Sequence, residues 1–69
     1  MSKNRLAEVR KDLGVTGREL RLASGVMEAT ISRIERGHQT PHISTKRKLA
    51  AALGVPMWMI WPGSKHRRK

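Results

Sequence analysis

The sequence contains no cysteine, tyrosine or phenylalanine, and its only residues of the Phe, Trp and Tyr group are Trp58 and Trp61. Without cysteine there is no disulfide, no thiolate metal ligand and no thiol nucleophile. Proteins that bind single-stranded nucleic acids stack bases on several aromatic side chains, and this chain offers almost none. Acidic residues are also few, with 5 against 15 lysines and arginines and a net charge of +10. Duplex nucleic acid is therefore the first partner to consider.

Long apolar runs are absent as well. The longest, residues 55–62, contains two prolines and is far too short to span a bilayer. The N-terminus lacks the apolar core of a signal peptide. By charge alone an anionic membrane would be the second candidate partner, but we expect none. We expect a cytoplasmic protein that is nucleoid-associated when bound to DNA.

Apolar residues recur at helical spacing in five segments separated by glycine and proline. The helices are expected at about residues 4–13, 17–24, 27–36, 44–53 and 56–61. Their inward positions are expected to be Leu6, Val9, Leu13, Leu20, Ala23, Val26, Ile31, Ile34, Leu49, Ala50 and Leu53, then Met59 or Ile60 with Trp61. The fold class is thus all-α, a compact bundle of five short helices. Residues 1–62 form one domain, and residues 63–69 form a basic tail that we expect to be disordered.

Two of these helices are joined by a tight turn. Thr16 and Glu19 have the spacing of a capping box, which predicts a helix start at Gly17. Gly25 can end that helix in a left-handed conformation. Two short helices joined in this way are typical of a helix-turn-helix, in which the second helix lies in the major groove of DNA.

The second helix of this pair has a polar outer face. If Ile31 and Ile34 point inward, the opposite face carries the candidate base-reading residues Glu28, Ala29, Ser32 and Arg33. Arg33 can donate two hydrogen bonds to guanine, and Ala29 can touch a thymine methyl group. Glu28 can accept from cytosine N4 or can hold Arg33 in place, and Ser32 can bond to a base or a phosphate. The alternative is an ordinary solvated helix face.

Contacts to phosphates are expected on both sides of this helix. They would fix the register of the protein on DNA without carrying sequence information. The candidates at the start of the helix expected at residues 17–24 are Thr16, Gly17 and Arg18. Those around the far end of the helix expected at residues 27–36 are Thr30, Arg36, Gln39, Thr40 and His42.

A longer pattern resembles the phage-repressor-like, or Xre, helix-turn-helix family over about residues 6–61. It consists of ELRLASGVMEATISRIERG followed by TP, TKRKLAAALGVP and a short last helix. The resemblance implies a five-helix protein that binds DNA, usually as a dimer on an inverted repeat. It places Glu28, Ala29, Ser32 and Arg33 at base-reading positions, and Thr16, Gly17, Arg36 and His42 near phosphate-contacting ones. It also implies a structural ion pair between Arg10 and Glu35.

Three positions differ from the family pattern. Gly17 stands where the family often has a glutamine, so only its backbone N–H can serve there. Arg21 stands where an alanine is usual and must bend its stem away. Lys46 stands at an often apolar position and must extend its ammonium group toward water or shift the fourth helix.

The last helix has more large apolar side chains than one short helix can bury. We therefore expect Met57 and Trp58 to form part of a dimer surface, whereas the alternative is that both tryptophans only enlarge a small core. The leading function is a sequence-specific transcriptional regulator, a repressor of phage, plasmid or other bacterial origin, bound to an inverted-repeat operator. The alternative function is an antitoxin-like or adaptor module that uses residues 57–61 to bind an unknown protein partner.

Residues suited to catalysis do not cluster in the sequence. Asp12 is the only aspartate, and Pro41 prevents His38 and His42 from sharing one helical face. No pair of nucleophile and base can be argued. We therefore expect no enzymatic activity, no metal and no cofactor.

Overall fold

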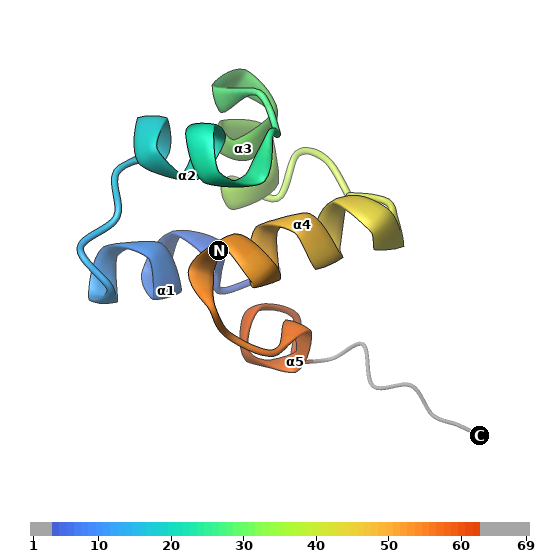
Figure 1. The fold of residues 1–69 in the computed structure, drawn as a ribbon. Helices are drawn as coiled ribbons and strands as arrows, with labels where there is room; N and C mark the ends of the chain where they lie inside the picture. The colour runs from blue at the N-terminus through green and yellow to red at the C-terminus, as the bar shows by residue number, and fades with distance from the viewer. Residues whose placement is uncertain (1–3, 63–69) are drawn as a thin grey trace.

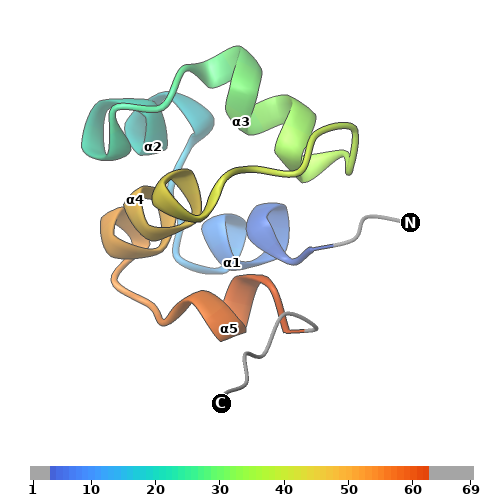
Figure 2. The same ribbon diagram turned by 90° about the vertical axis from the view of Figure 1, so that its right-hand side faces the viewer.

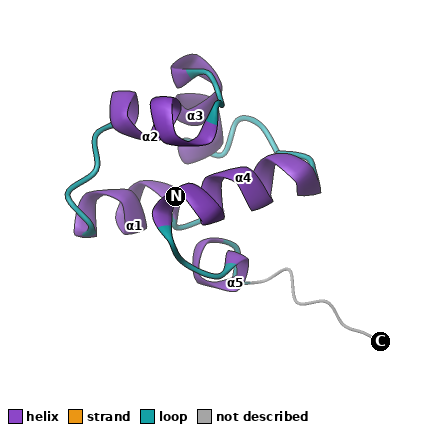
Figure 3. Cartoon of the chain, viewed as in Figure 1, coloured by secondary structure: helices purple, strands orange, loops and turns teal. Residues whose placement is uncertain are grey.

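The computed structural model describes residues 4–62, and within this range the chain forms five α-helices and no strand (Figure 3). They are α1 (Leu6–Asp12), α2 (Gly17–Ser24), α3 (Glu28–Glu35), α4 (Ile43–Leu53) and α5 (Met57–Ile60) (Figure 1). The predicted all-α class is confirmed. Both ends of α2 and the end of α4 match the prediction, and the other predicted helix ends differ by one or two residues. The predicted basic tail, residues 63–69, lies outside the described residues.

The helices are arranged around one core. In both ribbon views α2 and α3 lie on one side, α1 and α4 in the middle, and α5 on the other side (Figures 1 and 2). The buried apolar side chains are Leu6, Val9, Leu20, Val26, Ile31, Ile34, Leu49, Ala50, Leu53, Ile60 and Trp61. Among residues 4–62, no helix has the length and apolar character needed to cross a membrane. The helix pair α2 and α3 thus packs against the middle of the bundle, α2 against α4 and α3 against α1.

Local hydrogen bonds set both ends of α2, including the turn into α3. The capping box is confirmed, because Glu19 N donates to Thr16 Oγ1 at 3.0 Å and Thr16 N donates to Glu19 Oε1 at 2.8 Å. At the other end of α2, Gly25 has a φ of 79°, a left-handed conformation that suits glycine. The Ser24 hydroxyl donates to Leu20 O and accepts from Val26 N. These bonds fix the direction in which α3 leaves the turn.

Two residues predicted to be buried are exposed. Leu13 is 50% exposed, because α1 already ends at Asp12 and the chain turns there toward α2. Ala23 is exposed because the residue four positions after Leu20, not the one three positions after it, faces inward. That residue is Ser24, whose side chain is half-buried. An eight-residue helix such as α2 presents only a narrow inward stripe, so one position decides the face.

The start of α5 also differs slightly from expectation. Pro56 precedes the helix as its N-cap, with a ψ of 153°, instead of lying in its first turn. Ile60 and Trp61 are buried, while Met59 is only half-buried. Arg5 N donates to Ile60 O at 2.8 Å, and this bond joins α5 to the start of α1.

Candidate nucleic-acid interface

The inner side of α3 is fixed to α1 by an ion pair. Arg10 Nε lies 2.6 Å from Glu35 Oε2, and Arg10 Nη2 lies 3.2 Å from Glu35 Oε1. Arg10 Nη1 also donates to Val15 O at 2.9 Å. Both charged side chains are only 14% exposed. The hydrogen bond to Glu35 raises the pKa of Arg10, so its guanidinium stays charged throughout the pH range in which proteins are handled. The ion pair implied by the family resemblance is therefore present.

A second bond holds α3 from the same side. Asn4 Nδ2 donates to Ile34 O at 2.8 Å, while Asn4 Oδ1 accepts from Leu6 N at 2.9 Å. One side chain thus begins α1 and binds one of the last carbonyl groups of α3. Sequence reasoning gave Asn4 no such role. Its type and its place before an apolar helix were the available signal, since asparagine is favoured at helix starts.

The outer face of α3 carries the predicted base-reading residues. Glu28, Ala29 and Arg33 are exposed, and Ser32 is half-buried. Within residues 4–62, the side chain of Arg33 forms no hydrogen bond or ion pair. The predicted alternative in which Glu28 holds Arg33 does not occur. The guanidinium of Arg33 is therefore available to an external partner.

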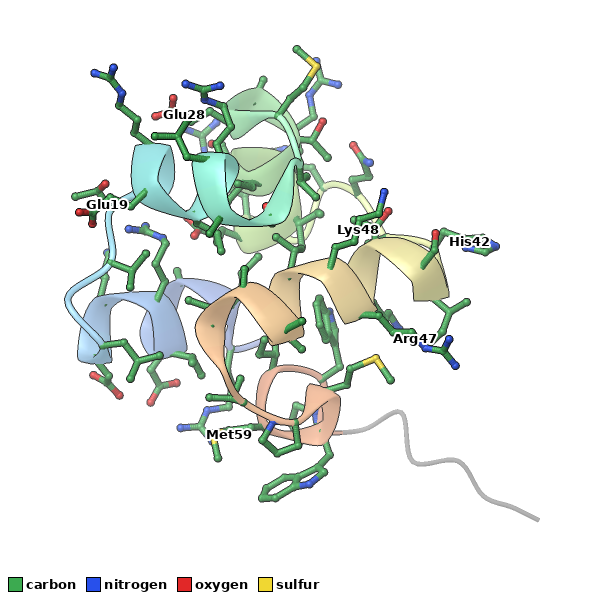
Figure 4. The ribbon with its side chains drawn as sticks, viewed as in Figure 1. Glu19, Glu28, His42, Arg47, Lys48 and Met59 are labelled. Carbon is green, nitrogen blue, oxygen red and sulfur yellow. The ribbon has the colours of Figure 1, made fainter. Side chains whose placement is uncertain are left out.

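Glu28 instead lies beside the start of α2. A β-carbon built on Gly17 would be 3.6 Å from Glu28 Oε2 and 3.8 Å from Glu28 Cγ. Figure 4 shows the side chain of Glu28 next to the first turn of α2. The α2 start and the outer face of α3 thus form one continuous surface.

The predicted phosphate contacts flank this surface. At the start of α2, Arg18 is exposed, and the amides of Gly17 and Arg18 have no acceptor among the described residues. Thr16 Oγ1 is already engaged in the capping box. Of the remaining candidates, Thr30 is half-buried, and Arg36, Gln39, Thr40 and His42 are exposed. Amides at a helix start attract anions such as phosphate.

His42 has a second role at the start of α4. Its Nδ1 accepts a hydrogen bond from Ser44 N at 3.2 Å, so the imidazole caps this helix. With Nδ1 as the acceptor, the neutral ring carries its proton on Nε2, which can donate to a phosphate. Arg47 and Lys48 are exposed on the same helix (Figure 4). Sequence reasoning did not assign them, although the run of basic residues there was the signal.

The apolar end of the chain is partly exposed. Trp58 is 61% exposed, whereas Met57 is half-buried against the core. Of the two residues predicted for a dimer surface, Trp58 therefore offers the larger exposed area. Lys46 is half-buried, and its Nζ lies 5.4 Å from the centre of the Trp61 ring. Its ammonium group thus rests over an aromatic face, which tolerates a cation well.

Residues suited to holding a metal ion are not grouped in the described part of the chain. Between residues 4 and 62, no three His, Cys, Asp or Glu side chains come close enough to form such a site. His38 and His42 are both exposed, and His42 uses Nδ1 to cap α4.

Comparison with known proteins agrees with this geometry. The family model for the helix-turn-helix matches residues 6–57. An uncharacterized HTH-type transcriptional regulator from Haemophilus influenzae is 42% identical over 51 residues, which are 74% of this chain and 52% of that protein. Another, RghRB from Bacillus subtilis, is 40% identical over 62 residues, which are 88% of this chain and 45% of that protein. The chain spans about half the length of these two relatives.

A solved structure shares the fold. It is the crystal structure of the restriction-modification controller protein C.AhdI from Aeromonas hydrophila. The two structures superpose with a TM-score of 0.76 at 29% sequence identity, over 80% of this chain and 83% of the other. The helix arrangement described above is therefore shared with a natural protein of similar size.

Proposed function

This chain belongs to the helix-turn-helix family, and on that premise we propose that it is a regulator of transcription that binds selected sequences of double-stranded DNA. The phage-repressor-like resemblance seen in the sequence is confirmed by the family match and the shared fold. One observation carries the proposal. Arg33 is exposed and unpaired among the described residues, on a helix whose opposite side is fixed by Arg10 and Asn4. A rigid helix with an unengaged guanidinium is suited to probing base edges.

The outer face of α3 supplies the proposed base contacts. Arg33 donates two hydrogen bonds to guanine O6 and N7, which is the commonest specific contact in the major groove. Ala29 lies one turn earlier and contacts a thymine methyl group. Ser32 bonds to a base or a phosphate, and Glu28 accepts from a base amino group. Together these residues would read a short half-site.

Phosphates would be held on both sides of the groove. The amides and the guanidinium at the start of α2 would bind one strand, and the residues around the end of α3 and the start of α4 would bind the other. The proposed contacts are Thr16, Gly17, Arg18, Thr30, Arg36, Gln39, Thr40 and His42. If a dimer forms, its two half-sites lie about one helical turn apart on an inverted repeat. Such a complex represses when its site overlaps a promoter.

Comparing base-pair preferences tests the proposal directly. We expect duplexes selected from a random pool by the full chain to share one motif. The Arg33→Ala variant should bind that motif about 1–3 kcal/mol more weakly and lose its preference for guanine at one position per half-site. Lys11→Ala is the matched control, because it also removes one exposed positive charge but from α1. Equal losses for both variants, with the motif unchanged, would contradict base reading by Arg33.

The exposure of Trp58 supports a second candidate function, that of a protein-interaction module. Sedimentation equilibrium across micromolar concentrations shows whether Trp58 forms a homodimer surface. If Trp58 forms a homodimer surface, the wild-type chain dimerises and Trp58→Ala does not. If both remain monomers while the selected DNA is bound one-to-one, the dimer surface is excluded. An adaptor or antitoxin-like role would instead require binding to a second protein that depends on Trp58 while the chain shows no preference among duplexes.

A further inference from the structure

The side chain of Glu28, the first residue of α3, lies beside Gly17, the first residue of α2. The distances of 3.6 Å and 3.8 Å from a β-carbon built on Gly17 are ordinary van der Waals contacts. No hydrogen bond or ion pair holds the Glu28 carboxylate among residues 4–62. The carboxylate therefore lies beside Gly17, where no side chain is present to hold it.

The start of α2 attracts this carboxylate. The amides of Gly17 and Arg18 have no acceptor among the described residues, and a helix start carries a partial positive charge. A DNA phosphate would be drawn to the same amides. A phosphate bound to these amides would repel the Glu28 carboxylate beside it. The phosphate would stay in place, because the duplex is held through several contacts. On binding, the Glu28 carboxylate would therefore turn from α2 toward the groove, because Gly17 has no side-chain donor that would hold it beside α2.

We propose that Gly17 is a positioning residue for base recognition and that it allows Glu28 to accept a hydrogen bond from cytosine N4. This inference rests on the proposed function. A carboxylate only accepts hydrogen bonds. In the major groove cytosine presents a donor, guanine and thymine present acceptors, and adenine presents an acceptor beside its amino group. Cytosine is thus the base that a carboxylate in this place favours.

Selection of bound sequences from a random duplex pool tests the inference, using the full chain and three variants. The wild type should enrich cytosine at one position per half-site, distinct from the guanine read by Arg33. Glu28→Ala should lose that preference by about tenfold. Gly17→Gln should lose it to a similar extent, because the glutamine amide can donate to the Glu28 carboxylate and hold it beside α2. Gly17→Ala should retain more of it than Gly17→Gln, since a β-carbon only touches the carboxylate.

The double variant Gly17→Gln/Glu28→Ala shows whether position 17 acts through Glu28. It should match Glu28→Ala, since the two changes remove one interaction. The melting temperature of each variant reports that the fold is intact, and Gly17→Ala keeps the test open if Gly17→Gln does not fold. An unchanged cytosine preference in Gly17→Gln would overturn the inference, as would a new preference that persists in the double variant. If the wild type enriches no sequence at all, the proposed function itself fails.

Discussion

The two faces of helix α3 differ in the exposure and pairing of their side chains, even where the residue type is the same. On the inner face, Glu35 is 14% exposed and receives two hydrogen bonds from Arg10. On the outer face, Glu28 is exposed and forms no ion pair within residues 4–62. The same contrast separates Ile34, which is fully buried, from its neighbour Arg33, which is exposed. One face of this helix is committed to the fold, and the other is left for a partner.

This difference has a physical origin. A charged group removed from water is costly unless it is paired and hydrogen-bonded, and Glu35 meets both conditions. A charged group left in water costs little and stays available for binding. Because the inner face supplies the rigidity, the outer face can hold uncommitted side chains in a fixed place. Changes on the inner face should therefore alter stability, and changes on the outer face should alter DNA recognition.

The largest expected effect is that of Ile34→Ala on the inner face. Ile34 is 0% exposed, so its truncation leaves a cavity in a small core. The free energy of unfolding should fall by about 2–5 kcal/mol. A domain of this size has only about 3–10 kcal/mol in total, so this loss is a large fraction of the stability of the fold. Urea denaturation followed by circular dichroism measures the loss.

Ile34→Val is the control, because it removes a single methylene and should cost about 0.5–1.5 kcal/mol. If Ile34→Ala were no less stable than Ile34→Val, the inner face would not be the anchor described here.

The next effect is that of Glu35→Leu. This variant leaves Arg10 charged and largely buried without its partner, and the free energy of unfolding should fall by about 3 kcal/mol. The double variant Arg10→Met/Glu35→Leu should recover most of this loss, because two apolar side chains replace the pair. Urea denaturation measures the free energy of unfolding of both variants. Equal instability of the single and double variants would show that the charge left on Arg10 is not the cause.

The sequence predicted the fold well because its signals are local. The capping box at Thr16 and the glycines that follow four of the helices mark helix ends without reference to any other part of the chain. The predicted ends were therefore correct to within one or two residues. The two wrong burial predictions, Leu13 and Ala23, depend on which side of a short helix faces its neighbours. That is settled by packing between helices, which no local signal reports.

The candidate site was predictable to a similar degree. Periodicity placed Arg33 on the outer face of α3, and the structure has it exposed. Periodicity could not decide whether Glu28 would pair with Arg33 or lie elsewhere, since both positions are within reach of a long side chain. The position of Glu28 beside the start of α2 depends on the angle between two helices. The bond from Asn4 to Ile34 O likewise joins residues far apart in sequence and could not be foreseen.

The smallest expected effect is that of Ser32→Ala, which should raise the stability of the fold and weaken the binding of DNA. Ser32 is half-buried near the edge between them, and its side chain forms no hydrogen bond among residues 4–62. Alanine favours the helix more than serine does, so the free energy of unfolding should rise by up to roughly 0.5 kcal/mol. Binding to the selected DNA should weaken by about 1 kcal/mol, because the hydroxyl that bonds to a base or phosphate is lost. Urea denaturation and a DNA titration of the same preparation measure both. A variant with unchanged stability and unchanged affinity would place Ser32 on neither face, and the recognition surface would then be confined to Glu28, Ala29 and Arg33.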